Sequence, residues 1–244
     1  MTDSNAPTPA VTTFPLNGRF PAIEVVAMPA APWTDAHEAA WQRRCAANPR
    51  LHDGAIWSAL HADATRITAC LDRYRRLTVQ ADTAIGDLGV RHVGVKGLMT
   101  ATDAGGVERI LFARRGTHTR AYGNMWEIAP AGGVDVVDGV PLSAQSIIAT
   151  LVKEASEELG IDASSSAFAA SPFLMVMDNS ARSLVFMVHL PWPGPFDLSW
   201  QLPETWEYSE SRWLTREQAE RWLRGNPDEI TPPAAAALTA FLSL

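Results

Sequence analysis

The chain has 244 residues, of which 47% are hydrophobic and 19% are charged, and its formal net charge is −7. This composition indicates a globular protein and excludes an intrinsically disordered chain. The negative charge argues against duplex nucleic acid as a partner, because binding to its backbone needs a basic surface. With two cysteines in no metal-binding pattern, no basic leader and no long apolar run, we expect a cytoplasmic protein without membrane contact.

The first 90 residues are predicted to form an arm and a small subdomain. Residues 1–20 are rich in Pro, Thr, Ser and Ala, and we expect them to be a flexible arm. Thr34 is a suitable helix N-cap, and Asn48 followed by proline ends that helix. Residues 21–90 therefore read as a helix-plus-hairpin subdomain. Its expected elements are a strand at 23–28, a helix at 34–47, and strands at 55–60 and 65–74.

Residues 91–244 are predicted to form the main domain, an α/β (α+β) sandwich with a mixed central sheet between helices. Ser143 caps a helix that Gly160 ends, Thr215 caps a second helix, and Pro232 opens a third. A double glycine at 132–133 opens a loop. The expected strands are 93–100, 110–114, 126–129, 173–177, 183–190 and 206–214, and the expected helices are 143–159, 215–223 and 232–242.

The helix at 143–159 has an apolar face and a separate acidic face. Glu154, Glu157 and Glu158 are spaced i, i+3 and i+4, so their carboxylates can converge on one point. The expected core-facing positions recur at helical spacing and are Ile148, Leu151, Val152, Ala155 and Leu159.

The acidic face is unfavourable for the helix by itself. Like charges at these spacings destabilise a helix by roughly 0.2–0.5 kcal/mol per pair, and anions in the last turn oppose the helix dipole. A divalent cation would reverse these effects. Hard carboxylate oxygens without histidine or cysteine nearby in sequence favour Mg²⁺ or Mn²⁺ over zinc.

The segments flanking these glutamates resemble the Nudix box, G-x5-E-x7-R-E-U-x-E-E-x-G-U, where U is aliphatic. Residues 153–161 (KEASEELGI) match its second half, and residues 126–133 (WEIAPAGG) resemble the strand and double glycine that precede it. This sequence departs from the box in three ways. Gln145 replaces a glutamate, Lys153 replaces the arginine, and the loop between Gly133 and Gln145 is about six residues longer.

The resemblance implies roles for particular residues. Glu154, Glu157 and Glu158 would bind Mg²⁺ or Mn²⁺, and the last two would also be catalytic. Among three acidic residues of the late loop, Glu207 is the expected additional base, in preference to Glu204 and Glu210. The expected orienting positions are Lys153, Gln145 and Gly133, and the expected substrate-binding positions are Arg114, Arg115 and Trp126, with Arg120 as an alternative phosphate ligand.

Three aromatic residues leave two interpretations open. Trp57, Tyr74 and Trp126 can stack on a base or pack in the core. The six histidines show no ligand spacing and are expected to be structural.

The expected function is metal-dependent hydrolysis of the diphosphate linkage of a nucleoside diphosphate joined to another moiety. Residues 48–54 and 86–90 resemble the extension of UDP-sugar-cleaving Nudix proteins, which suggests a nucleoside diphosphate sugar. One alternative is a non-nucleotide substrate such as an isoprenoid or thiamine diphosphate. Another is a non-catalytic ligand sensor, for which Gln145 is the sequence support. The expected partner is a small-molecule diphosphate, and a homodimer is compatible with the resemblance.

Overall fold

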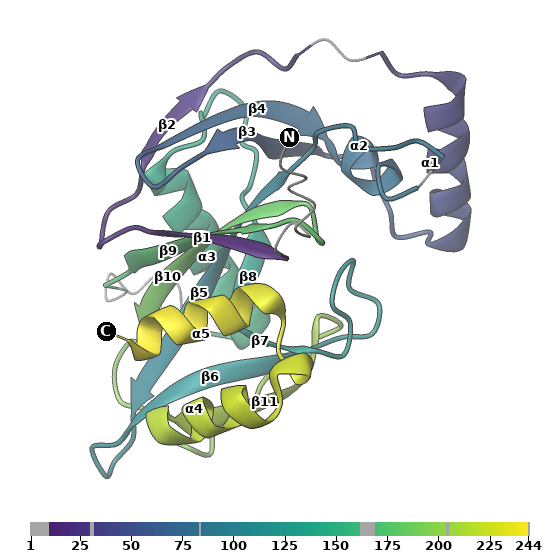
Figure 1. Ribbon diagram of the computed structural model, residues 1–244. Coiled ribbons are helices and arrows are strands. Elements are labelled where there is room, and N and C mark those ends of the chain that lie inside the picture. Colours follow the sequence, from purple (N-terminus) through teal and green to yellow (C-terminus); the bar gives the residue numbers. More distant parts are fainter. Residues whose placement is uncertain (1–9, 30–31, 83, 162–168, 204, 244) are drawn as a thin grey trace, which may run out of the picture.

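A computed structural model describes residues 10–29, 32–82, 84–161, 169–203 and 205–243 (Figure 1). Its strands are β1 (Val11–Pro15), β2 (Ala22–Val25), β3 (Ala55–Ala62), β4 (Arg66–Arg73), β5 (His92–Thr102), β6 (Glu108–Arg115), β7 (Trp126–Ile128), β8 (Ala131–Gly133), β9 (Ser171–Asp178), β10 (Ser183–Pro191) and β11 (Tyr208–Thr215). Its helices are α1 (Asp35–Ala47), α2 (Tyr74–Val79), α3 (Ala144–Leu159), α4 (Arg216–Gly225) and α5 (Pro232–Leu242), with a 3-10 turn, η1 (Pro227–Glu229).

All of these strands belong to one mixed sheet. The strand order along its main path is β1-β9-β10-β5-β3-β4-β2. Off this path, β6 pairs with β5, β7 and β11, and β8 pairs with β5. The neighbours β10 and β5 are parallel, whereas β9 and β10 are antiparallel. One core lies under α3 and includes Leu151 and Leu159, and a second lies under α4 and α5 and includes Leu238. The predicted α/β sandwich with a mixed sheet between helices is confirmed.

Two helices at the C-terminal end cover the second core. The yellow helices α4 and α5 lie together and contact β6, β9 and β11, at the opposite end of the molecule from α1 (Figure 1). Thr215 caps α4 through a hydrogen bond from the backbone N–H of Gln218, and proline opens α5, as the sequence predicts.

The expectation of a flexible arm over residues 1–20 is wrong for the part that the structure describes, from residue 10 onward. β1 pairs with β9 along its whole length, from Val11 opposite Asp178 to Pro15 opposite Leu174. Leu16 then enters the first core with 5% of its surface exposed. The open edge of β9 supplies backbone hydrogen-bond partners that the composition of this segment did not indicate.

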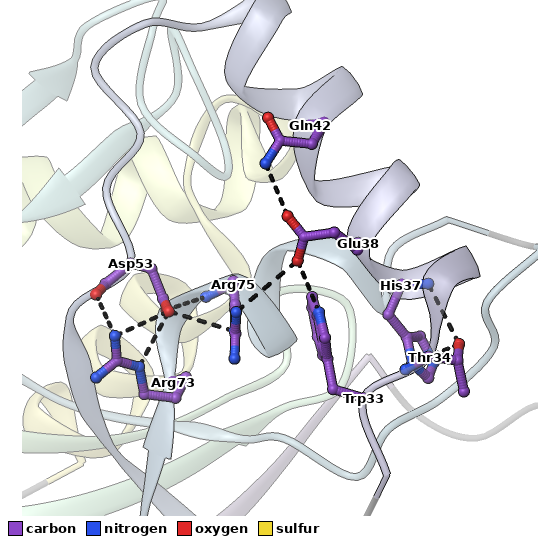
Figure 2. A network of polar contacts seen from close by, with 8 residues as sticks. All are labelled: Trp33, Thr34, His37, Glu38, Gln42, Asp53, Arg73 and Arg75. Carbon is purple, nitrogen blue, oxygen red and sulfur yellow. Dashed lines mark hydrogen bonds and ion pairs between the residues drawn. The ribbon is translucent and has the colours of Figure 1, made fainter.

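The helix and hairpin of the N-terminal region form as predicted, but the hairpin continues the main sheet. β3 meets β5 at a single residue pair, Ser58 with His92. α1 is tied to the hairpin by a polar network, which Figure 2 shows. Glu38 accepts a hydrogen bond of 2.9 Å from the Trp33 indole, and the Arg75 guanidinium lies 4.4 Å above that indole ring.

Three local differences separate the prediction from the structure. The segment expected to open a loop at 132–133 lies in β8, which pairs with β5. The short helix α2, at 74–79, was not predicted. In α3 the buried face includes Ile147 and Thr150, whereas Ile148 and Val152 are only partly buried, so it is rotated slightly from the predicted stripe. Among the described residues, no helix is long and apolar enough to cross a membrane.

Candidate active site

The C-terminal half of α3 carries two glutamates toward the sheet. The helix begins at a capping box between Ser143 and Ser146 and ends at Gly160, whose φ of 65° is left-handed and suits glycine. Glu158 is 4% exposed, and its carboxylate accepts a hydrogen bond of 2.8 Å from the backbone N–H of Ala131. α3 is therefore fixed at the point where its acidic face meets β8.

Glycine in β8 allows the helix to come this close. A Cβ atom at Gly132 would lie 2.1 Å from Oε1 of Glu154, which is far inside van der Waals contact. At Gly133 a Cβ atom would lie 2.3 Å from Cε1 of His92. The double glycine thus makes room for the Glu154 carboxylate on one side and for the His92 imidazole on the other.

A third carboxylate reaches the same place from the segment before β11. Glu207 shares a hydrogen bond with Glu158. One oxygen each from Glu154, Glu158 and Glu207 lies within 4.8 Å of the other two. The three carboxylates open on a cleft of about 640 Å³, whose lining residues are Glu154, Glu157, Glu158, Thr205, Trp206 and Glu207.

The pKa values of the two helix glutamates, Glu154 and Glu158, are raised. Burial, followed by the charge of Glu207, raises the pKa of Glu154 from 4.5 to about 7. Burial and the hydrogen bond with Glu207 raise the pKa of Glu158 well above its usual value. Glu154 and Glu158 thus keep their protons at a pH where free glutamates are ionised, because burial and the neighbouring carboxylates disfavour their charged forms.

The donor set fits a hard divalent cation. The candidate ligands are all carboxylate oxygens, and among the described residues no histidine or cysteine joins the cluster. Mg²⁺ and Mn²⁺ prefer this oxygen set, whereas zinc sites in proteins usually include nitrogen or sulfur. A cation there would also remove the repulsion that raises the pKa of Glu154.

We expect rising pH to lower the stability of the metal-free protein and added Mg²⁺ to raise it. The folded protein keeps the proton of Glu154 up to pH about 7, whereas the unfolded chain loses it near its ordinary pKa of 4.5. Stability of the metal-free protein should therefore fall as pH rises between these values. Adding Mg²⁺ should raise Tm by several degrees at pH 8 and much less at pH 5, because protons compete with the cation.

Thermal unfolding by calorimetry, with EDTA or with 5–10 mM Mg²⁺ (on the order of typical assay conditions), checks this expectation. Glu154→Gln serves as the matched variant, because it removes the ionisation while keeping the side-chain shape. It should show a smaller Mg²⁺-dependent rise in Tm at pH 8. An equal Mg²⁺ effect at both pH values in the unmodified protein would contradict the assignment.

A buried charge network lies beneath the carboxylate cluster. Glu127 is 0% exposed and forms ion pairs with Lys96 and Arg115. The Tyr208 hydroxyl lies 3.3 Å from Oε1 of Glu127. Burial alone would raise the pKa of Glu127, but the two cations hold it below its usual value. Sequence reasoning missed Lys96, Glu127 and Tyr208, although Lys96 and Glu127 stand out as charges inside apolar strands.

The structure separates the three predicted arginines. The guanidinium of Arg115 forms an ion pair with Glu127 and donates a hydrogen bond to the carbonyl oxygen of Ala121. Arg114 alternates with Arg115 along β6 and so points to the opposite face of the sheet from the glutamates. Arg120 is exposed, and its guanidinium donates to the carbonyl oxygen of Ala181 at 3.0 Å.

The aromatic candidates for base stacking are mostly core residues. Trp126 is 3% exposed and packs edge-on against Trp222 at 5.4 Å, with the Arg212 guanidinium 4.2 Å from its ring. Trp126 therefore offers little open ring surface for stacking, and its expected role in substrate binding stays a prediction that this packing does not support. Trp57 is 3% exposed and also belongs to the core, and Tyr74 is half-buried.

The other predicted site residues lie around the cluster. The side chain of Glu157 is 60% exposed and lines the cleft, and its partner Lys153 lies 3.9 Å away. Lys153 also pairs with Asp135 at 3.1 Å. Gln145 is exposed in the first turn of α3, nine residues before Glu154, which places it about 13 Å away along the helix axis.

The other acidic candidates of the late loop do not join the cluster. Glu210 is exposed, and its carboxylate lies 3.1 Å from the Arg212 guanidinium. Glu204 lies outside the described residues.

The model of the NUDIX domain family matches residues 90–236. Solved structures similar to the chain include a NUDIX hydrolase from Alicyclobacillus acidocaldarius, 12% identical, with a TM-score of 0.46 over 63% of this chain and 92% of that one. RenU, a Nudix hydrolase from M. smegmatis, is 18% identical, with a TM-score of 0.42 over 63% and 84%. A bifunctional NMN adenylyltransferase/ADP ribose pyrophosphatase from Francisella tularensis is 15% identical, with a TM-score of 0.44 over 66% and 43%. No curated protein matches the chain.

Proposed function

Since this chain belongs to the Nudix family of pyrophosphohydrolases, we propose that it hydrolyses the diphosphate linkage of a nucleoside diphosphate joined to another moiety, with Mg²⁺ or Mn²⁺. The observation that carries this proposal is the convergence of Glu154, Glu158 and Glu207 within 4.8 Å at the edge of a cleft. The matched region, residues 90–236, holds the whole cluster. We assign catalysis to residues 91–244 and treat residues 21–90 as an extension.

Glu154 and Glu158 would hold the metal ion, with Glu157 and Glu207 facing the same cleft. When bound, the ion supplies charge neutralisation for the diphosphate and makes the attacking water more acidic. The backbone N–H of Ala131 keeps Glu158 oriented, and Gly132 leaves room for Glu154. These contacts hold the carboxylates in place before substrate arrives, which reduces the cost of ordering them in the reaction.

Proton transfer in this scheme falls to Glu207. It directly precedes β11 and lines the same cleft as the helix glutamates, so it can face a water bound in that cleft. Its carboxylate would accept the proton of the attacking water.

Arg120 is our candidate for the distal phosphate. Its guanidinium donates to the carbonyl oxygen of Ala181, and no carboxylate forms an ion pair with it among the described residues. Arginine binds phosphate through paired N–H groups. Arg114 and Arg115, which the sequence also suggested, are turned away or already paired.

A hydrolysis screen tests the proposal directly. The purified protein is incubated with Mg²⁺ or Mn²⁺ and with UDP-glucose, ADP-ribose, NADH, dinucleoside polyphosphates, nucleoside triphosphates or isoprenoid diphosphates. We expect metal-dependent release of a nucleoside monophosphate from one of the nucleoside diphosphate derivatives, and we favour a sugar derivative. If the protein cleaves only isoprenoid diphosphates, its substrate is a non-nucleotide diphosphate. Inactivity on the whole panel would overturn the proposal.

A further inference from the structure

An exposed tryptophan borders the carboxylate cluster. Trp206 precedes Glu207 directly, lines the same cleft, and leaves 59% of its surface exposed. Among the described large hydrophobic residues, Trp206 has the largest exposed fraction. An indole exposed beside a polar cleft provides a flat apolar surface on which a ligand ring can stack.

The backbone beneath Trp206 is tightly held. The N–H of Gly116 donates to the carbonyl oxygen of Glu207 at 2.7 Å, and a Cβ atom at Gly116 would lie 2.3 Å from the carbonyl oxygen of Trp206. On the other side, the N–H of Tyr208 donates to the Thr205 hydroxyl at 3.2 Å. The indole is thus presented from a fixed loop, which suits a binding surface.

A cation from the N-terminal extension lies above this indole. The Arg50 guanidinium is 5.9 Å from the centre of the Trp206 ring. Arg50 is exposed, and no ion pair engages it in the part of the chain that the structure describes. The segment that carries it follows α1 and is held at Asn48, whose side chain accepts from the N–H of Arg50 at 3.1 Å.

The same segment is anchored at its other end by the network in Figure 2. The carboxylate of Asp53 accepts hydrogen bonds of 3.0 and 2.9 Å from the Arg73 guanidinium and one of 3.1 Å from the N–H of Arg75. Arg50 therefore stands on a short connection that is held at both ends, next to the Trp206 ring.

From this arrangement we propose that Trp206 and Arg50 together bind the planar heteroaromatic ring of the substrate, so that the N-terminal extension takes part in choosing it. A flat π surface next to the diphosphate site favours stacking with a base, and a guanidinium can cover the opposite side of a ring or contact the sugar and phosphate near it. A flexible aliphatic chain gains no such stacking. This inference rests on the proposed function, because it takes the carboxylate cluster as the diphosphate site.

The test is a comparison of two ligands that differ only in the ring. AMP and ribose 5-phosphate are titrated by calorimetry, with Mg²⁺, into the full-length protein and into Trp206→Ala, Trp206→Phe and Arg50→Ala. Leu198→Ala is the control, because Leu198 is 50% exposed on the preceding loop and does not line the cleft. We expect the unmodified protein to bind AMP roughly 5- to 100-fold more tightly than ribose 5-phosphate.

Trp206→Ala should abolish that preference, Trp206→Phe should keep most of it, and Arg50→Ala should reduce it in part. Equal affinity for the two ligands in the unmodified protein, including undetectable binding of both, overturns the inference. So does a preference that Trp206→Ala leaves unchanged. Hydrolysis of ADP-ribose is measured with the same samples to separate the two proposals. If the protein is active but shows no preference for AMP, the role of Trp206 and Arg50 is overturned and the proposed hydrolase function stands.

Discussion

Replacing Glu158 by Gln is expected to lower kcat for diphosphate hydrolysis by about 10³-fold, which corresponds to roughly 4 kcal/mol of lost transition-state stabilisation. Gln has the shape of Glu and can still accept the hydrogen bond from Ala131, so the helix should keep its place. It cannot supply a negative charge to a cation. Because the substitution also removes one of three crowded carboxylates, the metal-free protein should be as stable as the unmodified one or more stable.

Steady-state kinetics with the best substrate of the screen, paired with a thermal unfolding curve, measure both effects. Glu217→Gln is the matched control, because its side chain is 79% exposed on α4 and pairs only loosely with Arg221 at 4.0 Å. Near-normal kcat in Glu158→Gln would remove Glu158 from the catalytic site. Lost activity together with a large fall in Tm would point to a structural role instead.

Replacing Glu127 by Ala is expected to lower the free energy of unfolding by about 3–5 kcal/mol. The carboxylate of Glu127 neutralises two cations, Lys96 and Arg115, whose side chains are only 13% and 19% exposed. Its removal leaves both charges in a largely dry environment and leaves the Tyr208 hydroxyl without this acceptor. Breaking one side of a buried ion pair costs much more than breaking an exposed one.

Urea unfolding gives the size of this effect. Glu210→Ala is the matched control, because Glu210 also lies near two arginines, Arg114 and Arg212, but its side chain is 43% exposed. It should lose no more than about 1 kcal/mol. Losses of equal size in the two variants would show that burial of the Glu127 network contributes little to stability.

Local signals predicted most of the secondary structure. Caps at Thr34, Ser143 and Thr215 each accept a hydrogen bond from the backbone three residues later, and Gly160 ends α3 in a left-handed conformation. Element boundaries agree with the expected ones within three residues. These features depend on hydrogen bonds and backbone conformations within one turn, so neighbouring residues are sufficient to specify them.

Partners that come from distant segments were harder to predict. β1 was taken for an arm because its stability comes from β9, more than 150 residues later in the chain. The two adjacent arginines of β6 looked equivalent, yet strand alternation sends them to opposite faces and only the sheet decides which face holds the glutamates. Trp126 looked available for stacking until the packing of Trp222 and Arg212 around it was known.

The sequence by itself determined that a helix would present Glu154, Glu157 and Glu158 on one side, because their spacing follows from helix geometry. The tertiary structure decided which oxygens converge. It buries Glu158 against Ala131, brings Glu207 beside it, and leaves Glu157 at the rim. It also placed Arg50 over Trp206, across more than 150 residues of sequence. Convergence of this kind depends on how the sheet and its loops fold in space, which no local pattern of residues encodes.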